Sequence, residues 1–198
     1  SDAERLSIPD SFLQPAVRNG RAMPERQITR ATVESWKRND DPILLLRLTR
    51  DQELPTSIRD YLNSSAGRAA RQGYKCRNRA PWYAVPDVQI PDYVLSYMSG
   101  RRANLVRNAA GVSCTNSVHS IRIRDKEAAA KYLGQWSSPF VRLSCELEGH
   151  ALGGGMLKLE PREAGRIVFP AIPTFGKERD EEFKDAVKTM QRWRHYAD

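Results

Sequence analysis

The sequence predicts an α+β fold in a single domain, with a central, antiparallel-rich cluster of strands over about residues 82–123 flanked by helices. Two observations indicate this class. Alternating apolar and polar residues, typical of strands, gather in that middle stretch, whereas apolar residues at helical spacing occur on both sides of it. The chain has 198 residues, of which 40% are hydrophobic, which suits one domain or one domain with an appended helical layer.

Residues 1–53 are expected to form an N-terminal arm with a linking helix and strand. The first part, residues 1–25, predicts an irregular segment with at most one short helix, because proline and glycine recur there, at Pro9, Pro15, Gly20 and Pro24. Thr29 or Thr32 can cap a short helix that runs to Trp36. The apolar residues 43–48 then predict a buried strand.

Residues 54–170 are expected to form the body of the domain. A helix is predicted over residues 57–71, ended by Gly73. Extended chain is predicted at residues 82–85, and strands follow over residues 93–98, 104–108 and 111–123, the last with a bulge near Asn116. The turn between the first two strands consists of Ser99, Gly100, Arg101 and Arg102.

The rest of the chain reads mainly as helix. Helices are predicted over residues 126–136, capped by Asp125, and over residues 140–147 after Pro139. A turn of three glycines, residues 153–155, leads into an extended segment, a short helix starting at Pro161 and a last short strand at residues 167–169. Residues 171–198 predict an amphipathic helix that packs against another surface, because apolar side chains recur at helical spacing, at Phe183, Val187 and Met190.

The excess positive charge lies in one segment, residues 66–124, which we call the basic window. It holds ten Lys and Arg residues against two acids, Asp87 and Asp92. The whole chain has 32 basic and 24 acidic residues, so the remainder holds 22 of each and is neutral. Aromatic and amide side chains are interleaved with this charge, which favours a surface that binds a polyanion over a merely solvated basic face.

Composition also argues against several protein classes. No stretch approaches the roughly 20 apolar residues of a membrane helix, and no signal peptide is recognisable, so we expect a cytoplasmic protein without a membrane partner. The first residue is not Met, so we expect a fragment or a processed chain. Three widely spaced cysteines, Cys76, Cys114 and Cys145, indicate buried thiols rather than disulfides or a zinc site.

Catalytic patterns are weak. The histidines are scattered, the glycine cluster at residues 153–155 lacks the Lys-Ser/Thr of a phosphate-binding loop, and Ser113 and Ser117 have no glycine elbow. We therefore expect that this chain alone is not an enzyme and holds no metal or cofactor.

Three stretches of the chain resemble one family. They are the basic run KCRNRAPWY at residues 75–83, PDYVLSYMSGRRANLVRN at residues 91–108 continuing to CTNSVH at 114–119, and ALGGGMLKLEP at 151–161 with IVFP at 167–170. Together they resemble the C-terminal target-recognition region of bacterial gamma-class adenine-N6 DNA methyltransferases from restriction-modification systems. The resemblance covers about residues 54–170.

That resemblance implies sequence-specific binding of double-stranded DNA, as the target-recognition portion of a site-specific, adenine-specific DNA methyltransferase. The glycine motif for S-adenosylmethionine and the Asn-Pro-Pro-Tyr/Phe motif of such enzymes do not occur here. The resemblance therefore implies S-adenosylmethionine for a catalytic half that lies elsewhere, in the same polypeptide or in a separate subunit. Base extrusion during methylation requires a second domain that clamps the duplex.

Several side chains are candidates for the DNA contact. Arg101 and Arg102, with Ser99 in the same turn, can enter a major groove and contact guanine, although phosphate contact is the competing interpretation. Asn116 and His119 are candidates for reading base edges, or alternatively for internal hydrogen bonds.

Other candidates serve affinity rather than base recognition. Lys75, Arg77 and Arg79 alternate along a segment expected to be extended, so all three are predicted to track phosphates. Trp82 and Tyr83 can stack on a base, although a place in the core is favoured for them, and Arg107 and Arg122 complete the predicted DNA-binding set. The alternative function is a non-catalytic interaction module that binds RNA or an acidic protein through the same basic face.

Overall fold

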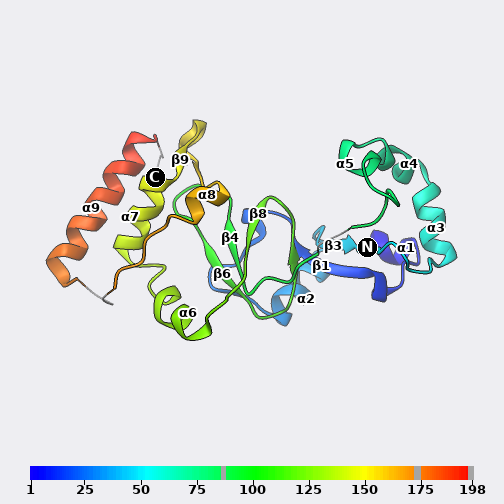
Figure 1. The fold of residues 1–198 in the computed structure, drawn as a ribbon, viewed down its shortest axis with the longest axis horizontal. Coiled ribbons are helices and arrows are strands. Elements are labelled where there is room, and N and C mark those ends of the chain that lie inside the picture. The colour runs from blue at the N-terminus through cyan, green and yellow to red at the C-terminus, as the bar shows by residue number, and fades with distance from the viewer. Residues whose placement is uncertain (86–87, 172–174, 196–198) are drawn as a thin grey trace.

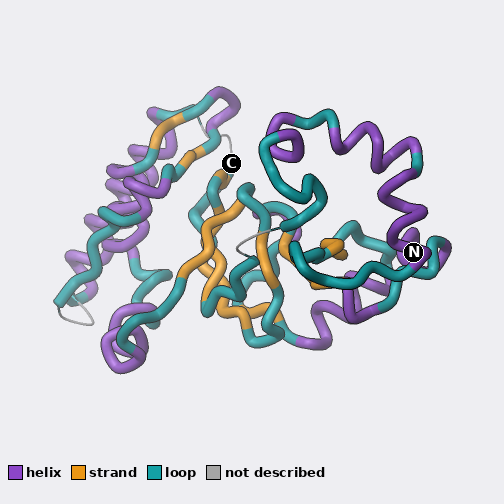
Figure 2. Tube along the Cα trace, turned by 45° about the vertical axis from the view of Figure 1, so that its right-hand side comes forward, coloured by secondary structure: helices purple, strands orange, loops and turns teal. Residues whose placement is uncertain are grey.

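The computed structural model describes residues 1–85, 88–171 and 175–195, and its mixed helices and sheets confirm the α+β class. Its elements form three packed groups in a row along the longest axis, with the largest sheet in the middle group (Figure 1). A view turned by 45° shows the strand-rich middle between two helix-rich ends (Figure 2). Each group has its own cluster of buried apolar side chains.

The N-terminal group is built on strand β1 (Leu13–Val17) and packs around Phe12, Leu48 and Ile58. Strand β1 pairs antiparallel with β3 (Leu44–Leu46) and parallel with β7 (Ser113–Cys114). The remaining elements are short: α1 (Asp2–Arg5), η1 (Asp10–Phe12), α3 (Thr56–Asn63), α4 (Ser65–Arg71) and α5 (Tyr74–Arg77).

The expectation of an irregular arm over residues 1–25 was wrong, because Pro15 lies inside strand β1. Strand β3 pairs with residues 13–15 and β7 with residues 16–17, so at Pro15 a neighbouring strand lies on one side. A proline that lacks an N–H is tolerated where the ladder does not need that donor.

The central group is a four-stranded sheet in the order β2-β6-β4-β8, formed by β2 (Gln27–Ile28), β6 (Leu105–Asn108), β4 (Tyr93–Ser96) and β8 (Val118–Ile121). The β4 strand is antiparallel to both neighbours, with Val94 opposite Val106 and Ser120. Helix α2 (Arg30–Arg38), capped by Thr29, places Val33 and Trp36 in the same core cluster as Val94. The predicted antiparallel strand cluster is therefore confirmed.

The C-terminal group joins a small sheet to four helices. Strand β10 (Leu157–Lys158) lies between β5 (Met98–Ser99) and β9 (His150–Ala151). The long helix α9 (Lys177–Trp193) packs along α7 (Pro139–Glu148), which confirms the predicted terminal helix and its docking. Two shorter helices, α6 (Lys126–Leu133) and α8 (Pro161–Ala164), and the turn η3 (Gly153–Gly155) complete the group; Gly154 has a positive φ of 71°.

Two predicted elements are divided in the structure. The helix expected over residues 57–71 is two helices, because Ser64 is extended and its hydroxyl caps α4. A Cβ at Gly67 would lie 2.2 Å from the carbonyl oxygen of Leu62, so the sharp bend needs glycine there. The strand expected over residues 111–123 is divided by a turn at Asn116, after which β7 and β8 belong to different sheets.

Three other expectations were wrong. The segment containing Lys75, Arg77 and Arg79 is not extended, because α5 takes up its first half. Residues 82–85 begin with a turn in which the Ala84 N–H donates to the Pro81 carbonyl oxygen over 3.1 Å. Residues 167–169 form no strand, because Val168 donates its N–H to the Ser144 hydroxyl over 2.9 Å instead of to a neighbouring strand.

No helix in the described ranges combines the length and apolar character that crossing a membrane requires. Asp87, one of the two acids in the basic window, lies outside the described residues.

Candidate nucleic-acid interface

The connection between β5 and β6 carries Arg101 and Arg102 and is closed at its base by two buried serines. The Ser96 and Ser99 hydroxyl oxygens lie 2.7 Å apart, and the Ser96 hydroxyl accepts the N–H of Asn104 over 2.8 Å. Ser99 is 7% exposed, so its hydroxyl serves the turn and not a ligand. We therefore leave Ser99 out of the contact set that the sequence predicted.

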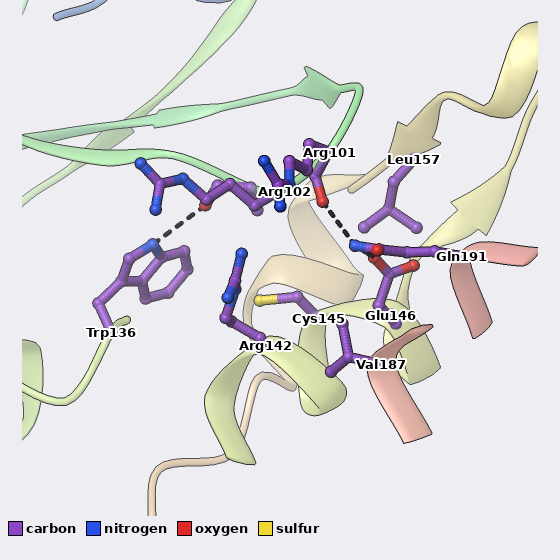
Figure 3. Close-up of a pocket in the computed structure, with 10 residues that line it drawn as sticks. Arg101, Arg102, Trp136, Arg142, Cys145, Glu146, Leu157, Val187 and Gln191 are labelled. Carbon is purple, nitrogen blue, oxygen red and sulfur yellow. Dashed lines mark hydrogen bonds between the residues drawn. The ribbon is translucent and has the colours of Figure 1, made fainter. Parts of the chain in front are cut away.

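Side chains from other elements hold the backbone of this turn from outside. Gln191 donates to the Arg101 carbonyl oxygen over 2.7 Å, and Trp136 donates its indole N–H to the Ala103 carbonyl oxygen over 3.2 Å (Figure 3). Arg194 donates to the Gly100 carbonyl oxygen over 2.8 Å. The backbone is thus fixed by three partners, while the side chains of Arg101 and Arg102 are exposed.

A third guanidinium reinforces the charge at this turn. Arg142 projects from α7 toward Arg101 and Arg102 (Figure 3). Its burial lowers the pKa of Arg142, and the positive charges of Arg102 and Arg101 lower it further. Arginine stays protonated despite such shifts, so positive potential accumulates at the turn. The carboxylate of Glu25 lies 3.9 Å from Arg102, which is a long and exposed ion pair.

The N-terminal segment adds two exposed arginines, one of them joined to the turn at Asn116, that sequence patterns did not reveal. The Thr115 hydroxyl donates to the Arg18 carbonyl oxygen over 2.6 Å, which joins this segment to the Asn116 turn. The following turn, η2 (Gly20–Ala22), is capped by Asn19. A Cβ at Gly20 would lie 3.4 Å from the carbonyl oxygen of Met98 at the start of β5. Arg18 and Arg21 are both exposed there.

Two residues of the segment 111–123 were predicted to read base edges. Asn116 is exposed, whereas the ring of His119 is engaged in internal contacts. Asn116 lies in the turn between β7 and β8. The His119 Nε2 lies 2.7 Å from the Leu159 carbonyl oxygen, and the ring packs edge-on against Tyr97 at 5.2 Å between ring centroids. His119 therefore has the internal role that was the alternative interpretation.

The basic residues of α5 lie away from the Arg101 turn. Helix α5 is at the end of the molecule opposite α9 (Figure 1), and Lys75 and Arg77 are both exposed on it. Residues two apart on a helix do not share a face, so the predicted one-sided phosphate track is not formed. Arg79 turns inward and donates to the Ala84 carbonyl oxygen over 3.3 Å. It also lines a groove of about 520 Å³ together with Arg47 and Arg50.

The aromatic pair after α5 packs together beside the N-terminal core. Trp82 and Tyr83 are half-buried and meet edge to face, with 5.9 Å between ring centroids. Tyr83 packs against the core cluster of Phe12, Leu48 and Ile58. Tyr83 thus lies where the core interpretation of this pair places it, whereas Trp82 is half-buried against Tyr83.

Arg107 and Arg122 are exposed at the far end of the central sheet. Arg107 lies directly opposite Tyr93 in the β4–β6 ladder, so their side chains share one face. The N–H of Arg107 donates to the Arg26 carbonyl oxygen over 3.2 Å, which brings a further exposed arginine alongside. The basic residues of the basic window therefore lie on several different elements, and the backbone of the turn at Arg101 is held by three side-chain hydrogen bonds.

Comparisons with known proteins identify a single family. The sequence matches the family described as the C-terminal domain of type II methyltransferase M.Eco57I over residues 1–197. It is also 25% identical, over 169 residues, to the type II methyltransferase M.XamI from Xanthomonas campestris pv. amaranthicola. That alignment covers 83% of this chain and 31% of the relative, so the chain spans about a third of that methyltransferase.

Proposed function

This chain belongs to the family of C-terminal domains of type II methyltransferase M.Eco57I, and from that membership we propose that it binds double-stranded DNA as the target-recognition part of a site-specific methyltransferase. The methyltransferase that it serves is proposed to modify N6 of adenine. The observation that carries the proposal is the turn between β5 and β6, where three side chains hold the backbone and two exposed guanidinium groups project.

A turn of this kind suits recognition of base edges. A guanidinium group can donate two parallel hydrogen bonds to O6 and N7 of guanine, and each such pair discriminates by about 1–3 kcal/mol. The geometry of a bidentate contact is strict, so a rigid backbone lowers the cost of placing the group. Arg18, Arg21 and Asn116 are exposed as well and offer further groups that suit phosphates and base edges.

The proposal divides the reaction between two parts. An adenine in a duplex must leave the base stack before its amino group can be methylated, and a second domain has to hold the DNA during that step. We assign this holding and reading role to the present chain. Binding of S-adenosylmethionine and methyl transfer are assigned to a catalytic domain, in the same polypeptide or in a separate subunit.

Selection from a random duplex pool tests the proposal. The chain should enrich one short sequence, and its affinity for that duplex should exceed its affinity for a shuffled duplex of equal composition. A single-stranded RNA of equal length and a polyglutamate peptide serve as competitors. Enrichment of no sequence, together with equal competition by RNA or polyglutamate, would instead support an interaction module for RNA or an acidic protein.

A further inference from the structure

We infer that Gln191 and Arg194, at the C-terminal end of α9, are positioning residues that set the orientation of the Arg101–Arg102 turn and so control sequence discrimination. The inference rests on the proposed function, because it concerns the same turn. It assigns a role in recognition to a terminal helix whose side chains at these two positions point into the molecule.

Arg194 is the centre of the junction. It is 5% exposed, and its guanidinium pairs in a bidentate manner with the equally buried carboxylate of Glu146, at 2.8 and 2.9 Å. It also reaches two turns that are far apart in the sequence. It donates to the Gly100 carbonyl oxygen over 2.8 Å and also to the Gly155 carbonyl oxygen. One side chain thus joins α7, α9, the glycine turn and the arginine turn.

Gln191 adds a second connection one helical turn earlier on the same face of α9. Its amide nitrogen donates to the Arg101 carbonyl oxygen over 2.7 Å and lies 3.3 Å from a carboxylate oxygen of Glu146. Glu146 therefore orients both donors, and the two donors bind consecutive carbonyl oxygens of the turn. Consecutive peptide groups held in this way cannot rotate independently.

The arrangement is better explained by positioning than by stability. A buried ion pair contributes little net stability, and replacing it with apolar groups is often neutral, because desolvation offsets the attraction. The space around it is also closed, since the cavity lined by Trp136, Arg142 and Gln191 measures about 10 Å³ and admits no ligand larger than water. What Arg194, Gln191 and Glu146 do in common is fix the backbone beneath Arg101 and Arg102.

Removing a hydrogen bond between α9 and the Arg101–Arg102 turn should reduce discrimination between DNA sequences and leave the general attraction to DNA intact. The variant Gln191→Leu keeps every charge of the turn, so contacts with phosphates persist. It removes the donor to Arg101, so bidentate contact with a base loses its fixed geometry. We expect the ratio of affinities for the selected duplex and the shuffled duplex to fall about tenfold, with an unchanged salt dependence.

The matched control is Thr189→Ala, because Thr189 is on the same helix and its hydroxyl is bonded within that helix, to Arg192. A second variant, Arg194→Lys, keeps the charge but loses the planar fork that reaches Glu146 and Gly100 together. Thermal unfolding shows whether each variant folds, and hydrogen exchange at the amides of residues 100–103 reports the turn without DNA. Exchange should accelerate in Gln191→Leu and Arg194→Lys and stay unchanged in Thr189→Ala.

The outcomes separate this inference from the proposed function. If the unaltered chain discriminates between the duplexes and Gln191→Leu retains that ratio within about twofold, the positioning role is wrong while target recognition stands. If the unaltered chain itself does not discriminate, the proposed function fails and the inference fails with it. Faster exchange with a reduced ratio supports both.

Discussion

At the scale of single residues, replacement of Arg101 or Arg102 tests whether the turn recognises bases. Replacing either by Ala should cost about 1–3 kcal/mol on the selected duplex if its guanidinium contacts a guanine edge. The cost on a shuffled duplex should be much smaller, because a phosphate contact is all that is lost there. Fluorescence anisotropy with both duplexes at one salt concentration measures the difference. Equal losses on both duplexes would assign the pair to phosphate contact and make Asn116 the leading candidate for base recognition.

A second prediction at this scale concerns the thiols. Burial, together with the neighbouring negative charge of Glu146, raises the pKa of Cys145 to about 12, above the ordinary value for cysteine. Because the thiolate is the reactive form, Cys145 should stay unmodified by iodoacetamide between pH 7 and pH 9 and react once the chain unfolds. Cys76, which is half-buried near the surface, provides the comparison, and mass spectrometry of peptides locates the label. Labelling of Cys145 in the folded chain at pH 8 would contradict its placement in the core.

At the scale of elements, α5 is expected to support DNA affinity without sequence preference. Lys75→Ala and Arg77→Ala should each weaken binding to all duplexes alike and reduce the salt slope by about one unit. Arg79→Ala should differ from both, since Arg79 donates to the Ala84 carbonyl oxygen and its loss loosens a loop. Titrations of the three variants at several salt concentrations, with thermal unfolding for Arg79→Ala, distinguish the two effects. A sequence-dependent loss in Lys75→Ala or Arg77→Ala would place α5 in the recognition surface.

The bend between α3 and α4 makes a further prediction for an element. Gly67→Ala places a Cβ 2.2 Å from the carbonyl oxygen of Leu62, so the backbone has to move. The free energy of unfolding should fall by about 1–3 kcal/mol, as for other overpacked sites. Ala66→Gly at the neighbouring exposed position is the control, and urea denaturation gives both values. A variant Gly67→Ala as stable as the unaltered chain would show that the bend does not depend on this glycine.

At the scale of the whole molecule, DNA binding should depend strongly on salt. If about five of the exposed basic residues contact phosphates, the log–log slope of affinity against salt concentration should be roughly −4 to −5. A slope near zero would favour an acidic protein partner. Calorimetry with S-adenosylmethionine complements this measurement, since we expect no saturable binding at micromolar concentration. Saturable binding would contradict this expectation and would show that this chain itself contains a site for S-adenosylmethionine.

The sequence by itself determined the class of the fold and the order of most of its elements, because hydrophobic periodicity and caps are local signals. The central strands β4 and β6, the helix capped by Thr29 and the terminal helix from Lys177 occur where these signals predicted them. The charge of the basic window was likewise readable, since a count of side chains needs no coordinates.

Tertiary structure alone decided which of these side chains act together. Strand β1 forms despite Pro15 because β3 pairs with it only up to that residue and β7 only after it, and those partners lie about 30 and 100 residues further along the chain. Ser99, Arg79 and His119 looked available for ligands, yet each is bonded internally by groups that only folding brings near. Helical spacing placed Arg194 on the docking face of the terminal helix, but the contacts of Arg194 and Gln191 with the arginine turn could not be predicted, because their partners, the carbonyl oxygens of Gly100 and Arg101, are about 90 residues away. Long-range backbone contacts of this kind leave no periodic pattern in the sequence, so the support of the arginine turn became visible only in three dimensions.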